Sequence, residues 1–166
     1  MHKCNLVHGD FHSGNLLLTH QSFVYISDLG LSKLADKPNN SNKIYGVIPY
    51  IAPEVLRGKP YTKAADIYSF GIIMWEMTSG IPAFNNIPHD FTLALNICQG
   101  LRPEIIEGYY AWICKIDEKC WDSDPNKRPT ADELVKCFTG WKDKCHYKYE
   151  NIQWIPVQVN NTFNYL

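Results

Sequence analysis

Several features that are common in secreted proteins are missing from this 166-residue sequence. Its six cysteines include no Cys-x-x-Cys pair, and the first residues show no charged segment followed by an apolar leader with a cleavage site. A secreted disulfide framework is therefore not expected. We expect a reducing intracellular compartment, the cytoplasm.

Long apolar runs and an excess of one charge are also missing. The longest apolar stretch, Ile67 to Met77, is interrupted by Ser69 and Glu76 and is too short to cross a bilayer. The chain has 16 Lys and Arg residues against 17 Asp and Glu residues, a formal net charge of −1, and no basic block. We therefore expect no membrane segment and no nucleic-acid partner.

The residues that are present suit one domain with a real core, since 45% of them are apolar. The clearest predicted helix runs from Thr62, which can cap it, to Gly80, which can end it. This segment is apolar nearly all round, and such a helix is usually buried. Gly71 inside it is expected to allow close packing.

Three more helices are expected along the chain. One covers residues 90–99, one follows residue 108, and one opens at the capping box Thr130 to Glu133. Their core-facing residues are expected to be Phe91, Ala94, Leu95 and Cys98, then Tyr109, Trp112, Ile113, Ile116 and Cys120, then Leu134, Phe138 and Trp141.

The polar residues near the start suggest a phosphate site. Two apolar runs, Leu16 to Thr19 and Phe23 to Ser27, are spaced as the strands of a hairpin. Pairing would bring Asn15 and Asp28 to the same end of this hairpin, with Asp10 one loop away. Three oxygen-bearing side chains in one corner suit a hard divalent cation and the phosphates that it bridges.

Five motifs then resemble those of protein kinases. His8-Gly9-Asp10 with Asn15 resembles the catalytic loop, and Asp28-Leu29-Gly30 resembles the magnesium-binding Asp-Phe-Gly triplet. Ala52-Pro53-Glu54 matches the triplet that closes the activation segment. The other two stretches are Asp66–Gly71 and Cys120–Thr130. Their order and spacing hold from residue 6 to about 140, and the tyrosine-kinase-like branch is the most similar.

This resemblance implies a mainly α fold of the α+β family, with a small β-hairpin and a buried central helix. Residues 1–140 would form the carboxy-terminal lobe (C-lobe) of the catalytic domain, and residues 141–166 a C-terminal tail. The implied cofactors are ATP and Mg²⁺, and the implied partner is a protein substrate whose hydroxyl receives the phosphoryl group.

The resemblance also implies a role for each site residue. Asp10 would orient the substrate hydroxyl, and Asn15 and Asp28 would bind magnesium. Leu17 would lie under the adenine, against Ile73 and Met77. The internal support that couples the loop to the central helix would consist of His8, Leu29 and Asp66.

The sequence contains no glycine-rich phosphate loop, no strand-borne Lys and no Glu partner for such a Lys. Residues 1–5 resemble only the last turn of the helix that precedes the catalytic loop. We therefore expect a C-lobe fragment whose further partner is the amino-terminal lobe (N-lobe), if it is encoded upstream. Activity of these residues alone is expected to be low.

Five positions depart from the family pattern, of which Leu29 for Phe is an apolar replacement that we expect to do little harm. Gly9 replaces the Arg that pairs with a phosphorylated activation loop, so switching by that route is in question. His12 stands where serine/threonine kinases carry a Lys near the transferred phosphate. Gly14 stands where many tyrosine kinases carry an Arg, so the class of hydroxyl stays open. Val47 replaces a Thr that often contacts the catalytic Asp.

Two alternatives remain for the function. The stretch His8–Asn15 also resembles the loop of aminoglycoside- and choline-type small-molecule kinases, although Ala52–Glu54 and Arg128 favour protein kinases. A non-catalytic pseudokinase or scaffold is the other alternative. A metal cluster at His8-x-Asp10-x-His12 is disfavoured, because a structural histidine is commoner at the position of His8.

Two regions carry further expectations. Glu54 and Arg128, 74 residues apart, would form a buried ion pair that anchors the activation segment. Residues 31–50 would form the activation loop, with Ser32, Ser41 and Tyr45 as possible modification sites. For any one of these hydroxyls, a merely solvated loop is the preferred interpretation.

Overall fold

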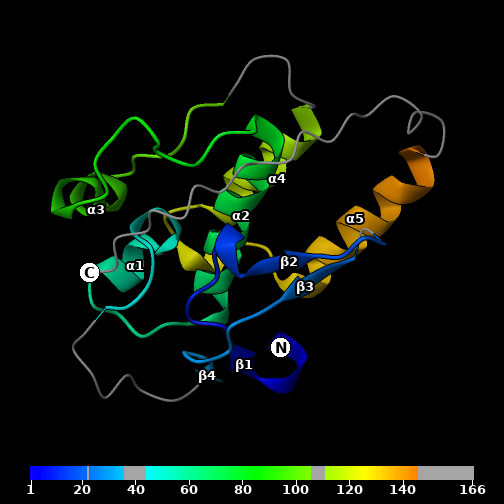
Figure 1. Ribbon diagram of the computed structural model, residues 1–166, viewed down its shortest axis with the longest axis horizontal. Helices are drawn as coiled ribbons and strands as arrows, with labels where there is room; N and C mark the ends of the chain where they lie inside the picture. The colour runs from blue at the N-terminus through cyan, green and yellow to red at the C-terminus, as the bar shows by residue number, and fades with distance from the viewer. Residues whose placement is uncertain (22, 36–43, 106–110, 146–166) are drawn as a thin grey trace.

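Helix α2 (Lys63–Ser79) stands at the centre of the computed structural model (Figure 1). Eleven of its residues are buried, and they cover every side of the helix. It begins after Thr62 and ends at Gly80, which has the left-handed φ of 72° that favours glycine. The predicted buried central helix is therefore confirmed.

The structure describes residues 1–21, 23–35, 44–105 and 111–145, with only the backbone for 111–114 and 141–145. The fold is mainly helical, as expected. In Figure 1, α1 and α3 lie on one side of α2, α4 lies beside it and α5 lies on the other side. The remaining helices are α1 (Pro53–Leu56), α3 (Phe91–Cys98), α4 (Ala111–Cys120) and α5 (Ala131–Cys145).

Two small antiparallel sheets stand near the start of the chain. The strands β2 (Leu16–Leu18) and β3 (Val24–Ile26) form the predicted hairpin, with Leu17 opposite Tyr25. The strands β1 (Leu6–Val7) and β4 (Lys33–Leu34) pair with Leu6 opposite Leu34. The 8–15 loop therefore begins at one sheet and ends at the other.

Helix α4 packs closely against α2 at Gly71. A Cβ at this position would lie 2.7 Å from Cβ of Cys120, so a side chain has no room. Cys120 and Ile116 are buried there, as predicted. Tyr109, Trp112 and Ile113 lie outside the residues whose side chains are described.

Helix α5 opens with the predicted capping box. The Glu133 carboxylate accepts from Thr130 N at 2.7 Å, and Thr130 Oγ1 accepts from Glu133 N at 3.3 Å. Leu134 is buried, and Phe138 packs edge-on against Phe70 of α2. Trp141 lies outside the described side chains, and α5 continues past residue 140 to Cys145.

The predicted core face of α3 is wrong for Phe91 and Leu95, whereas Ala94 packs against the core as expected. Phe91 is 80% exposed and Leu95 is 46% exposed, whereas Leu93 and Ile97 are fully buried. Asp90 caps the helix by accepting from Thr92 N and Leu93 N. Most of this eight-residue helix is apolar, so its packing against α1 and residues 48–50 selects the buried face.

Candidate active site

Asp66 of α2 holds the backbone of the 8–15 loop. Its Oδ2 accepts from His8 N at 2.8 Å, and its Oδ1 accepts from Gly9 N at 3.3 Å. His2 Nε2 lies 2.8 Å from the same Oδ2. Because Asp66 is only 4% exposed, this anchor fixes the loop on the central helix. The predicted coupling of His8 to Asp66 is confirmed.

Leu29 does not belong to this internal support, so that part of the prediction is wrong. Its side chain is 58% exposed. It follows Asp28, whose backbone is left-handed with a φ of 55°.

The ring of His8 links the loop to the end of β3. Nδ1 accepts from Asp10 N at 3.3 Å, and Nε2 lies 2.9 Å from the carbonyl oxygen of Ser27. A nitrogen that accepts an N–H cannot carry a hydrogen itself, so the hydrogen lies on Nε2 and points at Ser27. His8 is 2% exposed and acts as a structural histidine, as expected.

Asn15 is oriented by the end of the hairpin and by the 8–15 loop. Its carbonyl oxygen accepts from Ser27 N at 2.8 Å, and its Nδ2 donates to the carbonyl oxygen of Asp10 at 2.9 Å. The second bond fixes which side of the amide carries the NH₂ group. Asn15 Oδ1 therefore faces away from Asp10 and is oriented as an acceptor.

Asp28 lies at the same end of the hairpin as Asn15, because Ser27 pairs with Asn15. Its Oδ1 accepts from Gly30 N at 3.1 Å, and the residue is exposed. A carboxylate and an amide oxygen are ligands that Mg²⁺ accepts, and Mg²⁺ usually keeps several waters and phosphate oxygens as well. The two residues thus fit a magnesium site, and their role as its ligands stays a prediction.

Asp10 is a largely buried carboxylate with one oxygen left unpaired. Its side chain is 12% exposed, and Oδ2 lies 3.7 Å from Nε2 of His12. Oδ1 has no hydrogen-bond partner among the described residues. An unpaired buried acceptor is costly and calls for an explanation, of which a catalytic role is one.

The sequence reasoning missed a buried network beneath the loop. Tyr50 Oη lies 2.7 Å from both carboxylate oxygens of Glu76 and 2.9 Å from Oγ of Ser13. Ala83 N donates to Glu76 Oε1 at 2.8 Å. Burial raises the pKa of Glu76, and the bonds from Ala83 and Tyr50 oppose that rise. The signal in the sequence was the carboxylate of Glu76 within the apolar second half of the helix.

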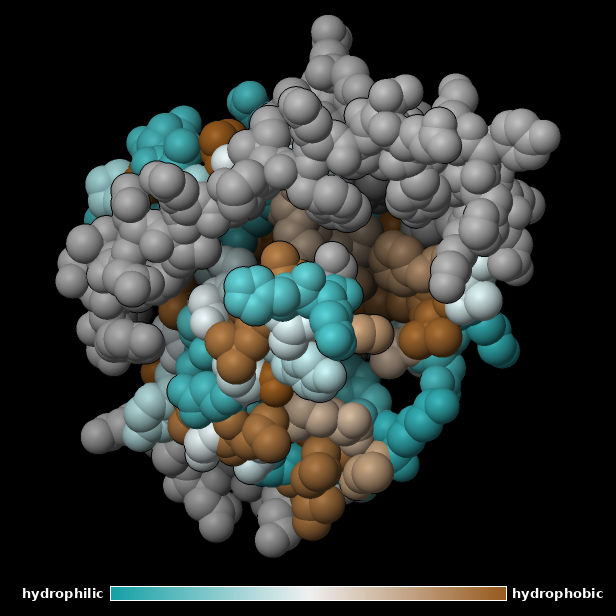
Figure 2. Space-filling view, turned by 45° about the vertical axis from the view of Figure 1, so that its right-hand side comes forward, coloured by the Kyte–Doolittle hydropathy of each residue, from teal (hydrophilic) through white to brown (hydrophobic). Residues whose placement is uncertain are grey.

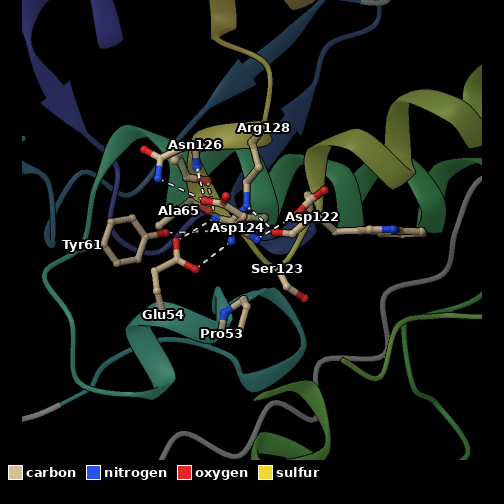
Figure 3. Close-up of polar contacts among 12 residues, drawn as sticks. Pro53, Glu54, Tyr61, Ala65, Asp122, Ser123, Asp124, Asn126 and Arg128 are labelled. Atoms are coloured by element: carbon tan, nitrogen blue, oxygen red, sulfur yellow. Dashed lines mark hydrogen bonds and ion pairs between the residues drawn. The ribbon is translucent and has the colours of Figure 1, made fainter. Parts of the chain in front are cut away.

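The predicted ion pair between Glu54 and Arg128 is confirmed (Figure 3). Nη1 and Nη2 each donate to one carboxylate oxygen at 2.7 Å. Nε donates to the carbonyl oxygen of Asp122 at 2.8 Å, and Nη1 also donates to that of Ala64 at 2.9 Å. The two side chains are 0% and 6% exposed, so the guanidinium is buried and well paired.

Leu17 lies on an apolar hairpin surface. It is 56% exposed, Met77 is half exposed and Ile73 is buried. Figure 2 turns the side of the molecule that carries this hairpin toward the viewer, and apolar side chains gather among polar ones on that face. The contact of Leu17 with adenine stays a prediction.

The possible modification sites differ in their surroundings. Ser32 Oγ donates to the carbonyl oxygen of His8 at 3.3 Å, whereas Tyr45 is 49% exposed. Ser41 lies outside the described residues.

Comparison with known proteins identifies the family. The model for protein tyrosine and serine/threonine kinases matches residues 1–138. The chain belongs to the protein kinase family. Among the described residues of this kinase chain, no helix is long and apolar enough to span a membrane. The described residues also contain no group of three or more His, Cys, Asp or Glu that could hold a metal ion.

Similar kinases are much longer than this chain. A probable serine/threonine-protein kinase of Dictyostelium discoideum is 33% identical over 96% of the chain and 10% of its own length. A serine/threonine-protein kinase of Arabidopsis thaliana is 29% identical over 82% of the chain and 24% of its own length. A serine/threonine/tyrosine-protein kinase of the same plant is 29% identical over 87% of the chain and 37% of its own length. The chain therefore spans well under two thirds of each relative.

Proposed function

We propose that this chain is the C-lobe of a protein kinase of the tyrosine-kinase-like branch. Its residues would serve phosphoryl transfer from Mg-ATP to a hydroxyl of a protein substrate, in the cytoplasm. The observation that carries this proposal is the 8–15 loop, which is anchored on Asp66 and leaves one Asp10 oxygen unpaired. Residues 1–140 would form the lobe and 141–166 a tail.

Each site residue has a defined part in this proposal. Asp10 orients the attacking hydroxyl and accepts its proton, while Asn15 and Asp28 bind the magnesium. Bound Mg²⁺ would neutralise charge on the phosphates during transfer. Leu17 supplies an apolar surface for the adenine. The N-lobe, if it is encoded upstream, would cover the nucleotide from the other side.

Two observations weigh against the alternatives. The pair Glu54–Arg128 ties the activation segment to the lobe, and small-molecule kinases lack this set of motifs. The presence of Asp10, Asn15 and Asp28 together weighs against a scaffold without catalysis. Protein phosphorylation therefore accounts best for the residues present.

The test uses the full-length protein and Asp10→Asn. Loss of a general base typically costs about 10²–10⁴-fold in rate, so phosphorylation of a protein substrate should fall by that factor. Binding of Mg-ATP should persist in Asp10→Asn and weaken in Asp28→Asn. Asp132→Asn, which changes an exposed carboxylate on α5, is the matched control.

Two outcomes would contradict the proposal. Full transfer activity in Asp10→Asn would exclude Asp10 as the base. Binding of nucleotide without any transfer by the wild type would instead favour the scaffold.

A further inference from the structure

The ring of His12 is buried beside Asp10 and has a defined orientation. The residue is 4% exposed. Its Nδ1 accepts from Gly14 N at 3.1 Å, and its Nε2 lies 3.7 Å from Oδ2 of Asp10. Since Nδ1 accepts a backbone N–H, the hydrogen of the neutral ring lies on Nε2, the nitrogen that faces Asp10.

Neighbouring groups fix this ring in place. It packs on the ring of Tyr50, with the centroids 5.8 Å apart. Tyr50 is itself held by Glu76 and by Ser13, the residue next to His12. Turning the imidazole away from Asp10 would break the bond to Gly14 and this ring contact.

The carboxylate of Asp10 is confined on its other side by Gly46. A Cβ at Gly46 would lie 3.3 Å from Oδ1 of Asp10, and Gly46 has a φ of +120° that other residues rarely adopt. Asp10 therefore lies between an imidazole on its Oδ2 side and a glycine backbone on its Oδ1 side. One oxygen is close to a donor and the other is left unpaired.

We propose that His12 is a positioning residue for Asp10. As a neutral imidazole with its hydrogen on Nε2, it holds Oδ2 and thereby fixes the orientation of the carboxylate that receives the substrate hydroxyl. The inference rests on the proposed function, which makes Asp10 the base. The separation of 3.7 Å is longer than a hydrogen bond, and such contacts often shorten when substrate binds.

This role differs from that of the Lys which the family resemblance places at the same position. A residue that contacts the transferred phosphate must present a cation to the nucleotide. His12 is buried, its Nδ1 is engaged by Gly14, and its Nε2 faces the carboxylate. The two roles predict different behaviour of the same variants.

The first test is spectroscopic and needs only the folded chain. In ¹⁵N-histidine-labelled protein at pH 7, long-range ¹H–¹⁵N correlations should show His12 with a hydrogen on Nε2 and none on Nδ1. The signals that vanish in a folded His12→Gln variant assign the residue. A hydrogen on Nδ1, or on both nitrogens, would overturn the inference.

The second test is kinetic and uses the full-length protein. Gln at this position can still present an N–H to Asp10, whereas Leu cannot. His12→Leu should lower kcat on the order of 10- to 100-fold, the cost of a misplaced catalytic group, with KM for ATP unchanged. His12→Gln should recover most of that loss. His89→Leu, which changes an exposed histidine bonded to Phe84, is the control and should match the wild type.

The remaining outcomes separate this inference from the proposed function. Equal losses of kcat in His12→Leu and His12→Gln, with a raised KM for ATP, would indicate a lost phosphate contact and overturn the positioning role. Unchanged kcat in His12→Leu would overturn it too. If Asp10→Asn retained activity, the proposed function itself would fail, and the role of His12 with it. Circular dichroism checks that each variant is folded.

Discussion

Asp117 is a single residue whose burial should make the fold sensitive to pH. It lies in α4, is 2% exposed, and its Oδ1 has no hydrogen-bond partner among the described residues. Burial, with a smaller contribution from Glu118, raises the pKa of this carboxyl to about 7 from the ordinary 3.8. The folded state therefore favours the neutral form of Asp117.

We expect this residue to lower the stability of the fold at pH 8 relative to pH 5. A carboxyl with a raised folded pKa gives its full contribution below the unfolded pKa and loses it as pH rises through about 7. At about 1.4 kcal/mol for each pKa unit, the loss is a few kcal/mol. Urea unfolding at both pH values should show a smaller difference for Asp117→Asn.

The control for this experiment is Glu118→Gln, which changes the exposed neighbour and should keep most of the pH dependence. An Asp117→Asn variant with the pH dependence of the wild type would contradict the prediction.

Two buried tyrosines should respond in opposite ways to removal of their hydroxyls. The guanidiniums of Arg102 and Arg128 both lie over the ring of Tyr68, whose hydroxyl is unpaired among the described residues. Tyr68→Phe should leave the free energy of unfolding unchanged or raise it. Tyr50→Phe removes the hydroxyl donor to the buried Glu76 carboxylate, which keeps the bond from Ala83 N, and should cost about 1–3 kcal/mol. Urea unfolding compares them, and equal losses would contradict the argument.

The site residues that the sequence could predict are those in fixed motifs. Asp10, Asp66, Glu54 and Arg128 follow from spacing, and the last two pair as expected. The bond between Tyr50 and Glu76 could not be predicted, because it depends on how residues 48–50 lie against α2. Buried atoms without a hydrogen-bond partner, such as Oδ1 of Asp117, could not be predicted either, because their lack of a partner depends on the surrounding fold.

At the scale of elements, two helical glycines form a matched pair. Ala at Gly71 would place its Cβ 2.7 Å from Cβ of Cys120, whereas Ala at Gly140 would meet nothing within 4 Å. Gly71→Ala should therefore destabilise by about 1–3 kcal/mol through overpacking. Gly140→Ala should stabilise by roughly 0.5–1 kcal/mol, the usual gain of Ala over Gly in a helix.

Thermal unfolding of both glycine variants tests this difference. A Gly71→Ala variant as stable as the wild type would show that α4 can move away from α2 without cost.

Helices differ in how well their core faces can be predicted. The burial of helix α2 was predictable because the helix is apolar on all sides, so the prediction did not require knowing which face turns toward the core. In α3 the apolar residues outnumber the places available in the core, and packing against α1 buries Leu93 and Ile97 rather than Phe91. The periodicity of the sequence identified the helix, but it could not determine the rotation of the helix about its own axis, which decides the buried face.

At the scale of the whole molecule, the pair Glu54–Arg128 joins the activation segment to the start of α5. Arg128→Leu would leave a buried carboxylate uncompensated, which costs about 3–5 kcal/mol. The melting temperature should fall by roughly 10 °C for a chain of this size. Circular dichroism measures it.

The control is Arg57→Leu, at an exposed arginine bonded to the carbonyl oxygen of Cys98. It should shift the melting temperature far less. Similar shifts in both variants would make Arg128 an ordinary surface residue.

The exposed hairpin bears on the activity of these residues alone. Apart from Leu16, the apolar side chains of β2 and β3 are about half exposed or more, among them Leu17, Leu18, Val24 and Tyr25. With no glycine-rich loop and no strand-borne Lys in the sequence, several contacts to the phosphates are missing, each worth about 2.7–4 kcal/mol. The 166-residue chain should therefore hydrolyse ATP and phosphorylate peptides far below the usual kinase rate of about 1–100 s⁻¹.

An assay of the purified chain beside Asp10→Asn tests this expectation. Magnesium-dependent turnover at that usual rate, abolished in Asp10→Asn, would show that the missing contacts are dispensable.

The separation of 74 residues between Glu54 and Arg128 also sets an order of events during protein synthesis. At about 5–20 residues per second, the ribosome adds Arg128 roughly 4–15 s after Glu54. Throughout this interval the nascent chain carries a carboxylate whose native position is buried and whose partner has not been made. Helix α2 can form locally in that time. Helix α1, which carries Glu54, can be fixed in place only after Arg128 has been added. A premature stop shortly before codon 128 should therefore leave a chain that chaperones and proteases treat as unfinished, although most of its core residues are already present.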